Sequence, residues 1–431
     1  MRERCLIIAD DLTGGADAGA QFVRYGLSTF LVSFVETLSI DFSRYTGKDV
    51  LVINTDSRAV SPGKASHLIS MVVEGYSPDL FPVIYKKIDS TLRGNVGYEL
   101  DALIEGTNDS LCFMTPAYPE QGRTVVDGIL MIRGKPLAST EISRDAAFPV
   151  KESRVSRLLE LQSRNPVGWI GLEEVASGAE KLQRRVEEKR EKGNRIIVFD
   201  AASRQDLMNI ADVAFRMERK PLFAGSAGLA REIARKLSLS TSRSTKSSQR
   251  SPKPYRHILI VSGSASSVTH QQLRQVEAKD IPFFVLPSEW VIHDDPASEI
   301  GEKKLSKKIA HALSEGSALM KAPPEFIQEE MGLRAQLMIT ETLASLALSA
   351  LEGSGVRADD LALILTGGET AMSIIRLLRA EEIEIEEELL EGIMKGHVKG
   401  GRWDGLTVVT KAGAFGKDDT FKNIVEILER G

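Results

Sequence analysis

Cys5-Leu-Ile-Ile-Ala9, followed at once by Asp10-Asp-Leu-Thr-Gly-Gly15, carries the pattern from which the fold of this chain can be predicted. The first five residues form a short apolar run, which is typical of a buried strand. The next segment predicts a helix, because its small and apolar residues follow the spacing i, i+3, i+4, i+7 of one helix face. These residues are Ala16, Gly19, Ala20 and Val23. A strand that leads directly into a helix is the building unit of α/β proteins.

The same alternation of apolar runs and helical spacings continues along the chain. Further strands are predicted at residues 50–54, 83–86, 111–114, 196–199 and 222–224. A helix face follows the strand at 83–86 and consists of Val96, Leu100, Leu103 and Ile104. Strands that alternate with helices predict right-handed crossovers and a mostly parallel sheet.

A polar, Ser-rich segment interrupts this alternation at residues 241–255 and ends in prolines. It holds too few apolar side chains to pack against a core. Beyond it, strands are predicted again at residues 257–262, 361–366 and 406–410. We therefore expect two α/β domains, each with a mostly parallel sheet flanked by helices: residues 1–240, then a linker at 241–256, then residues 257–431.

Residues 381–388 form an acidic run, Glu-Glu-Ile-Glu-Ile-Glu-Glu-Glu. A dense run of like charges is typical of a solvated helix face. We expect a helix at this position.

Composition narrows the class of protein. The chain has 431 residues, of which 42% are hydrophobic and 27% charged, as in ordinary soluble globular proteins. Its formal net charge of −5 argues against a general nucleic-acid-binding protein. Two cysteines, Cys5 and Cys112, are too few for a disulfide framework or a Cys-rich zinc site. No signal peptide and no apolar run of the roughly 20 residues that span a bilayer are found, so we expect a cytoplasmic protein without a membrane partner.

Polar and charged residues follow the first three predicted strands of the N-terminal domain. They lie in Asp10-Asp11, in Asn54-Thr-Asp-Ser-Arg58 and in Lys87-Ile-Asp-Ser-Thr-Leu-Arg93. Ligands of open α/β sheets bind outside the carboxyl ends of the strands, so these clusters are expected at one edge. Arg58 and Arg93 can grip a carboxylate with paired N–H donors, and Lys87 adds a mobile charge. Asp11 and Asp89 can accept hydrogen bonds from hydroxyls or help to deprotonate one.

These clusters predict a site for a small hydroxy acid, but local structure explains single residues equally well. Asp10 and Asp11 could cap the helix that follows, and Asp56 and Ser57 could form a simple turn. Residues 116–124, which include Arg123, suit either a loop near an anion or a rigid turn. Residues 225–230 start a helix, and they could either offer free N–H groups to a ligand or pack closely against a strand.

In the C-terminal domain, small residues follow three predicted strands. They are found in Ser262-Gly-Ser264, in Thr366-Gly-Gly-Glu-Thr370 and in Thr410-Lys-Ala-Gly-Ala-Phe-Gly416. Such turns present unpaired N–H groups at helix N-termini and favour phosphate, so together they predict a nucleotide site. The chain lacks the Walker A spacing, a GxGxxG motif after its first strand and the HExxH motif, and its six histidines show no metal-ligand spacing.

The combination of motifs, in this order, resembles the four-carbon acid sugar kinase family over nearly the whole chain. The matching stretches are Ile8-Ala-Asp-Asp-Leu-Thr-Gly14, Asn54-Thr-Asp-Ser-Arg58, Lys87-Ile-Asp-Ser-Thr-Leu-Arg-Gly-Asn95, Pro116-Ala-Tyr-Pro119, Gly225-Ser-Ala-Gly-Leu-Ala230, Ser262-Gly-Ser264, Thr366-Gly-Gly-Glu-Thr370, Thr410-Lys411 and Phe415-Gly416.

The resemblance implies a two-domain, ATP-dependent kinase, in which the N-terminal domain holds a four-carbon sugar acid and the C-terminal domain holds ATP. The phosphoryl group goes to the terminal 4-hydroxyl. The substrate contacts that it implies are Asp11, Arg58, Lys87, Ile88, Asp89 and Ser90. The ATP contacts that it implies are Ser264, Gly367, Gly368, Glu369, Thr370 and Gly413.

Chemistry adds further expectations to this set. Arg93 joins the substrate residues, Asp11 or Asp89 is the candidate base, and Arg58 with Lys87 fixes the carboxylate. Mg²⁺ is expected on the ATP phosphates, oriented by Glu369 or an aspartate, although no metal-ligand set is identified. A homodimer is the default expectation.

The form Lys-Ile-Asp-Ser-Thr-Leu-Arg-Gly at residues 87–94 resembles threonate and erythronate kinases more than 3-oxo-tetronate kinases. D-Threonate is the expected substrate, with D-erythronate and a 3-oxo-tetronate as alternatives. Ala414 stands where the family often has glycine, and its added methyl group is expected to tighten that loop. Two other classes stay open: a binding protein without turnover, and a dehydrogenase, which the missing dinucleotide fingerprint disfavours.

Overall fold

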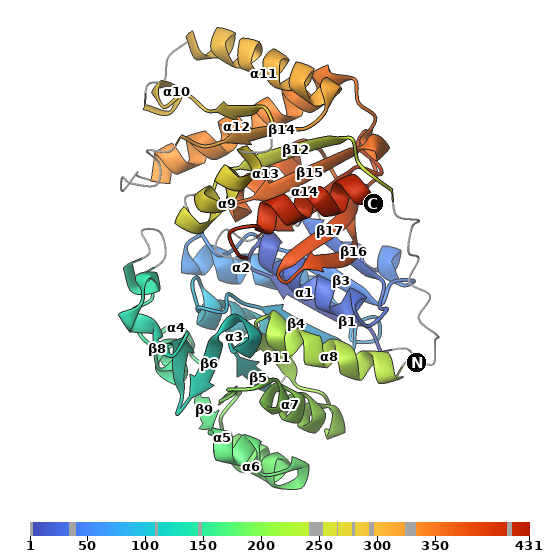
Figure 1. The fold of residues 1–431 in the computed structure, drawn as a ribbon. Helices are drawn as coiled ribbons and strands as arrows, with labels where there is room; N and C mark the ends of the chain where they lie inside the picture. The colour runs from blue at the N-terminus through green and yellow to red at the C-terminus, as the bar shows by residue number, and fades with distance from the viewer. Residues whose placement is uncertain are drawn as a thin grey trace. The chain divides into compact units, whose positions relative to one another are not determined.

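The computed structural model describes residues 3–33, 40–107, 111–144, 149–240, 253–264, 266–277, 281–292, 297–323, 333–411 and 416–431. The chain divides into two compact units, Met1–Ser247 and Ser248–Gly431. Each unit contains a mostly parallel sheet with helices packed on it, which confirms the predicted fold class (Figure 1). Most of the predicted linker lies outside the described residues, so the predicted domain limits stay a prediction. Gly413, a predicted ATP residue of the C-terminal domain, also lies outside them.

The sheet of the N-terminal unit has the strand order β2-β3-β1-β4-β11-β5-β10-β9, and its neighbours pair in parallel. The strands are β1 (Cys5–Ala9), β2 (Thr29–Ser33), β3 (Val50–Asn54), β4 (Val83–Lys87), β5 (Cys112–Thr115), β9 (Val167–Ile170), β10 (Ile196–Phe199) and β11 (Leu222–Gly225). The helices are α1 (Leu12–Val23), α2 (Pro62–Glu74), α3 (Val96–Thr107), α4 (Val155–Gln162), α5 (Leu172–Val175), α6 (Ala179–Glu191), α7 (Arg204–Arg216) and α8 (Ala227–Ser240). Strands β1, β3 and β4 are buried along their whole length, because they lie in the middle of the sheet.

A small antiparallel sheet in this unit was not predicted. It consists of β6 (Arg123–Val126), β7 (Ile129–Ile132) and β8 (Lys135–Pro136). The turn between the first two strands is Asp127-Gly128, and both residues have a positive φ, of 52° and 74°. Asp-Gly between two apolar runs is a strong hairpin signal, so this element could have been predicted from the sequence.

The sheet of the C-terminal unit has the order β13-β14-β12-β15-β18-β17-β16. Its strands are β12 (His257–Ser262), β13 (Phe283–Val285), β14 (Ala318–Lys321), β15 (Leu361–Thr366), β16 (Glu382–Leu390), β17 (Ile393–Lys399) and β18 (Thr407–Lys411). Its helices are α9 (Ser267–Glu277), α10 (Glu289–Ile292), α11 (Ala297–Glu315), α12 (Leu333–Ser354), α13 (Gly368–Leu377) and α14 (Thr420–Arg430). The pairs from β13 to β18 are parallel, whereas β17 runs antiparallel to both of its partners, β18 and β16.

The helix predicted at residues 381–388 is wrong, because this acidic run forms strand β16. Its sequence alternates with a period of two, so Ile383 and Ile385 are buried at 1% and 4% exposure. Glu384 between them faces outward and pairs with Lys399 of β17 at 2.7 Å. Alternation with β-branched residues predicts a half-buried strand, and here it outweighs the density of charge.

In the described part of the chain, no helix is both long enough and apolar enough to cross a bilayer.

Candidate functional site

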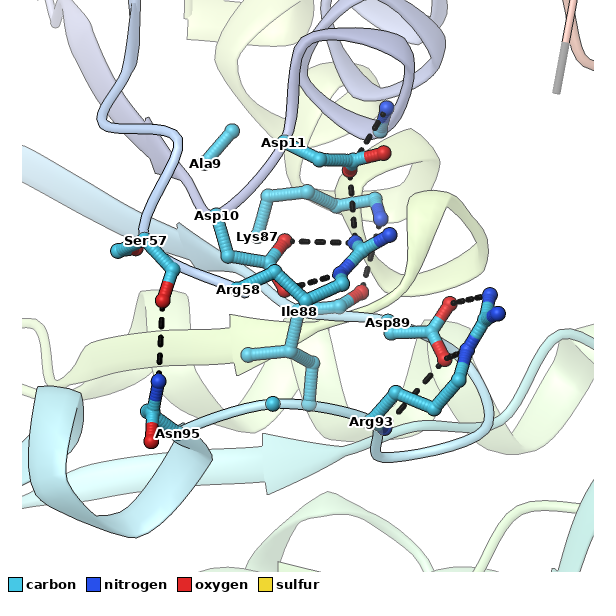
Figure 2. A network of polar contacts seen from close by, with 12 residues as sticks. Ala9, Asp10, Asp11, Ser57, Arg58, Lys87, Ile88, Asp89, Arg93 and Asn95 are labelled. Carbon is cyan, nitrogen blue, oxygen red and sulfur yellow. Dashed lines mark hydrogen bonds and ion pairs between the residues drawn. The ribbon is translucent and has the colours of Figure 1, made fainter. Parts of the chain in front are cut away.

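Three neighbouring strands of the N-terminal sheet bring the predicted acid-binding residues to one edge. Ala9, the last residue of β1, pairs with Asn54 at the end of β3 and with Lys87 at the end of β4. The loops after these strands carry Asp11, Arg58 and Asp89, and their side chains lie close together in Figure 2. The structure therefore gathers the N-terminal residues that the sequence pattern singled out.

Arg58 is held by two aspartates. Its Nε donates to Asp10 Oδ2 at 2.8 Å, and its Nη2 donates to Asp10 Oδ1 at 2.9 Å and to Asp11 Oδ1 at 2.7 Å. The Arg58 side chain is 15% exposed. The paired N–H edge with which a guanidinium grips a carboxylate is thus occupied by Asp10, a partner that sequence reasoning assigned only to helix capping.

Asp11 both caps helix α1 and belongs to the charged cluster. Its Oδ1 accepts a hydrogen bond from Gly14 N at 3.0 Å, and its Oδ2 accepts one from Thr13 Oγ1 at 2.7 Å. Burial raises the pKa of Asp11, but the positive charges of Arg58 and Lys87 outweigh burial, so the pKa lies below its ordinary value. Asp11 is therefore ionised at neutral pH and can only accept hydrogen bonds from a ligand.

Lys87 lies against the first turn of α1. Its Nζ donates to Ile88 O at 2.8 Å, and a Cβ added at Gly14 would lie 3.0 Å from that Nζ. Glycine at position 14 therefore leaves the space that the ammonium group approaches. Ile88 is completely buried, and its carbonyl oxygen accepts the hydrogen bond from Lys87, so the structure presents no exposed part of this residue to a ligand.

Asp89 organises its own loop. Its carboxylate accepts hydrogen bonds from Arg93 Nε at 2.8 Å and Arg93 Nη2 at 3.2 Å (Figure 2). The Thr91 hydroxyl also donates to it. Leu92 in the same loop has a φ of 59°, a conformation that is uncommon for residues other than glycine. Burial raises the pKa of Asp89, but Arg93 and Arg58 hold this pKa well below its usual range. Ser90, the next predicted substrate residue, is half-buried in this loop.

Both candidate bases are thus carboxylates with low proton affinity. They are well placed to accept hydrogen bonds from hydroxyls, and they are weak bases in this state. Neither Asp11 nor Asp89 is therefore a general base with a pKa near neutral pH.

A second network, of buried polar side chains, connects the loop after β3 with β4 and α3. Lys86 Nζ lies 2.9 Å from Glu99 Oε2, with side-chain exposures of 0% and 1%. The Ser57 hydroxyl bonds to the other oxygen of Glu99, and Asn95 Nδ2 donates to Ser57 O at 3.0 Å (Figure 2). Sequence reasoning missed Lys86 and Glu99, because a charged pair separated by 13 positions leaves no local pattern.

The predicted nucleotide residues lie at the carboxyl ends of β12 and β15. Ser262 and Thr366 are register partners, and Gly263 N donates to Thr366 O at 3.1 Å. Gly367 has a φ of 97°, and a Cβ added there would lie 3.2 Å from Ser264 N. The two turns are therefore packed together.

Residues 368–370 form the first turn of α13. Thr370 is buried, at 1% exposure, against Gly263, whereas Glu369 is exposed. Gly413 lies outside the described residues, so the structure brings together Ser264, Gly367, Gly368, Glu369 and Thr370 but does not place the last predicted ATP residue.

Among the described residues, no group of three or more Asp, Glu, His or Cys side chains could hold a metal ion. Mg²⁺ in phosphate-transfer sites takes only one or two carboxylates and otherwise binds phosphates and water. An exposed carboxylate at position 369, at the N-terminus of α13, fits this pattern.

The helix start at residues 225–230 is explained by close packing. A Cβ added at Gly225 would lie 2.7 Å from Thr115 O, and one added at Gly228 would lie 2.8 Å from Ala117 O. Of the two explanations that the sequence left open, the structure supports backbone packing at these glycines.

Two family descriptions match this chain. The first is a sugar-binding N-terminal domain, which matches residues 5–233. The second is a nucleotide-binding C-terminal domain, which matches residues 259–421.

Three curated relatives match along nearly their whole length. A D-threonate kinase of Salmonella typhimurium is 30% identical, covering 99% of this chain and 98% of the relative. A D-erythronate kinase of Heliobacterium modesticaldum is 29% identical, with coverages of 98% and 96%. A 3-oxo-tetronate kinase of Pseudomonas fluorescens is 27% identical, with coverages of 98% and 97%.

Two crystal structures share the fold. A Salmonella typhimurium protein described as a tRNA synthase has a TM-score of 0.79 at 24% identity, covering 98% of both chains. A Haemophilus influenzae protein described as a member of a family of unknown function has a TM-score of 0.73 at 26% identity, covering 98% of this chain and 100% of its own.

Proposed function

The chain belongs to the four-carbon acid sugar kinase family, and within it we propose that the enzyme phosphorylates the 4-hydroxyl of D-threonate with ATP, giving D-threonate 4-phosphate. The chain is a kinase, as are the relatives named above, which leaves the dehydrogenase and the binding protein without support. The observation that carries the proposal is the edge at β1, β3 and β4, where two ionised aspartates lie beside Arg58 and Lys87.

The aspartates are the groups suited to the hydroxyls of a sugar acid. Asp11 and Asp89 are acceptors, and each hydroxyl of the substrate can donate one hydrogen bond to a carboxylate. Phosphoryl transfer passes through a loose transition state that needs positioning more than proton abstraction. The low pKa of both carboxylates is therefore compatible with a role in orienting the attacking hydroxyl.

The same chemistry favours a hydroxy acid over a keto acid. A 3-hydroxyl can donate to an ionised carboxylate, whereas a 3-oxo group has only lone pairs and would face it without a hydrogen bond. An unmatched acceptor in a buried site costs about 1–3 kcal/mol. D-Threonate and D-erythronate are therefore favoured over 3-oxo-tetronates, and the sequence of residues 87–94 points the same way.

At the nucleotide turns, Ser264 and residues 367–370 would hold the ATP phosphates through backbone N–H groups and hydroxyls. Mg²⁺ bound with ATP would neutralise phosphate charge, and Glu369 is the residue proposed to orient it. Both assignments are proposals that rest on the packing of the turns described above.

The test is a screen of ATP consumption with D-threonate, L-threonate, D-erythronate and 3-oxo-tetronates. We expect the highest kcat/KM with D-threonate, and ³¹P NMR of the product should show a phosphate coupled to the two hydrogens on C4. Consumption of ATP with none of these acids would refute the proposal. Light scattering of the purified enzyme tests the accompanying expectation of a homodimer.

A further inference from the structure

Four polar side chains form one row across the carboxyl ends of the C-terminal strands. In the register of the sheet, Ser262 of β12 pairs with Thr366 of β15, and Thr366 pairs with Lys411 of β18. On the other side of β12, Ser262 pairs with Lys321 of β14. Register partners of parallel strands point to the same face of a sheet, so two hydroxyls lie side by side between two lysines.

The row lies on the face of the sheet that helices α9 and α14 cover (Figure 1). Ile260 and Ile364, two positions before Ser262 and Thr366, belong to the apolar core between the sheet and these helices. Because side chains alternate between the two faces of a strand, the residues two positions later point the same way. The row therefore ends this core at the edge where the predicted nucleotide turns begin.

The side-chain hydroxyls of Ser262 and Thr366 are buried and have no hydrogen-bond partner within the part of the chain that the structure describes. The two residues are 1% and 0% exposed. A buried polar atom without a partner lowers the stability of a protein, and most such atoms in folded proteins are hydrogen-bonded. Two of them on register partners, at the edge where a nucleotide is expected, indicate groups that a ligand engages.

The charge around the row favours an anion as this ligand, although a hydroxyl can either donate or accept. Lys411 is completely buried at one end of the row, and its Nζ lies 5.3 Å from the centre of the Phe421 ring in the first turn of α14. The N-terminus of a helix adds a partial positive charge there. Burial lowers the pKa of Lys411 to about 7, an effect that a neighbouring anion would oppose. Lys321, at the other end, is paired with Glu277.

We propose that the hydroxyls of Ser262 and Thr366 donate hydrogen bonds to a phosphate oxygen of the bound nucleotide, beside Lys411. This inference rests on the proposed function, because it adds two contacts to the nucleotide site of the kinase. The turns that follow the two strands would offer backbone N–H groups to the same phosphates. The unmet hydroxyls lower the stability of the free enzyme, and nucleotide binding removes that cost.

The experiment measures ADP affinity and thermal stability in the wild type and in variants that lack one hydroxyl. Thr366→Val keeps the shape of the side chain, and we expect it to weaken ADP binding about tenfold to a hundredfold in calorimetric titration, the range of a hydrogen bond to a charged group. Without nucleotide, its thermal midpoint should rise by about 2–4 °C, because an unmet buried hydroxyl has been removed. Binding of adenosine, which carries no phosphate, should not change.

Two further variants test the same pair of hydroxyls. Ser262→Ala should weaken ADP binding in the same range without lowering the thermal midpoint of the free enzyme. Thr366→Ser should bind ADP within about threefold of the wild type, because it keeps a hydroxyl at this position.

Thr407→Val is the matched control at the opposite end of β18. The Thr407 hydroxyl is buried, and it forms a hydrogen bond of 2.6 Å with the Tyr255 hydroxyl. Its removal should lower the thermal midpoint and leave the affinity for ADP unchanged, because this hydroxyl has a partner within the protein.

Wild-type affinity for ADP in Thr366→Val would overturn the inference. A lower thermal midpoint of this variant without nucleotide would also overturn it, since the hydroxyl would then have a partner in the free enzyme. So would an equal loss of affinity for ADP and adenosine, which would separate the effect from the phosphates. ADP binding that these substitutions weaken, in an enzyme that phosphorylates none of the acids, overturns the proposed function alone. A wild type that does not bind ADP overturns both.

Discussion

Arg58 joins the two aspartates that follow β1, and its loss should disable the acid site while sparing the nucleotide site. Arg58→Ala leaves Asp10 and Asp11 without their shared counter-charge, at side-chain exposures of 3% and 15%. We expect the KM for the sugar acid to rise at least about tenfold, with a loss of about 3 kcal/mol in stability. Steady-state kinetics with each substrate varied in turn measures this, and an unchanged KM for the acid would remove Arg58 from the site.

Lys86 and Glu99 form a buried ion pair next to the site. Breaking this pair should lower the free energy of unfolding by an amount that depends on pH. Burial raises the pKa of Glu99, with Lys86 opposing that rise. Lys86→Met leaves an isolated buried carboxyl, at a cost of about 3–5 kcal/mol when it is ionised. Because the folded-state pKa is raised, protonation at low pH removes much of that cost, and the cost grows as pH rises through it.

Urea unfolding of Lys86→Met and of the wild type at pH 5 and pH 8 measures this difference. The variant should lose more stability at pH 8. A loss of equal size at both values would show that Glu99 does not carry the effect.

Lys411, at the end of β18, is completely buried, and burial lowers its pKa to about 7. The unfolded chain keeps this proton up to about pH 10.4, the ordinary value for lysine. Between those values the unfolded state binds more protons, so this residue makes stability rise with pH, by up to about 1.4 kcal/mol per unit.

Lys411→Met should therefore flatten the rise in unfolding free energy between pH 7 and pH 10. Lys395→Met is the comparison, since Lys395 on the neighbouring strand has its pKa raised: burial opposes that rise, but Glu386 and Glu387 outweigh it. The two variants should differ in slope, and identical slopes would contradict the assignment.

Among the helices and strands, hydrophobic periodicity predicts the strands that carry the site. The sequence analysis does not predict strand β16 or the hairpin of β6 and β7. Strands β1, β3 and β4 are continuous apolar runs and were found within one residue of their ends. Strand β16 was read as a helix because its glutamates were weighed above its alternating isoleucines. The hairpin of β6 and β7 lies outside the strand–helix alternation, and its signal is the turn Asp127-Gly128.

Helix α1 begins at the site, and its first turn has room only for glycine at position 14. A Cβ on Gly14 would lie 2.3 Å from Asp11 Oδ1 and 3.0 Å from Lys87 Nζ, so Gly14→Ala must displace both groups. We expect kcat/KM to fall at least about tenfold, since small misplacements of positioned groups cost about that much or more. Stability should fall by about 1–2 kcal/mol, because displacing Asp11 weakens the N-cap of α1, and the higher helix propensity of alanine offsets only part of that loss.

Gly63→Ala is the matched substitution in α2, where the added Cβ would meet nothing within 4 Å. This variant should keep full activity and gain slightly in stability. Activity assays and thermal unfolding of both variants decide the matter, and a fully active Gly14→Ala would show that the Asp11–Lys87 arrangement is not needed.

At the scale of the molecule, the sequence located both candidate sites but not the pairing within them. Ligand positions follow from strand ends, which the pattern reveals, so Asp11, Arg58 and Asp89 were found together. Which cation meets which carboxylate depends on side-chain directions set by tertiary packing. The pairing of Arg58 with Asp10, and of Lys86 with Glu99, therefore had no signal in the order of residues.

The division into two compact units, Met1–Ser247 and Ser248–Gly431, predicts how the ligands affect unfolding. Each unit contains its own strands, helices and buried apolar side chains, so calorimetry should resolve two transitions. A ligand that binds one folded unit stabilises that unit alone, and at a hundredfold excess over its Kd it should raise one transition by roughly 5 °C. D-Threonate should raise one transition and ADP the other, whereas Arg58→Ala should lose only the response to D-threonate. A single transition that both ligands raise equally would show instead that the two units unfold as one, since each site would then stabilise the whole chain.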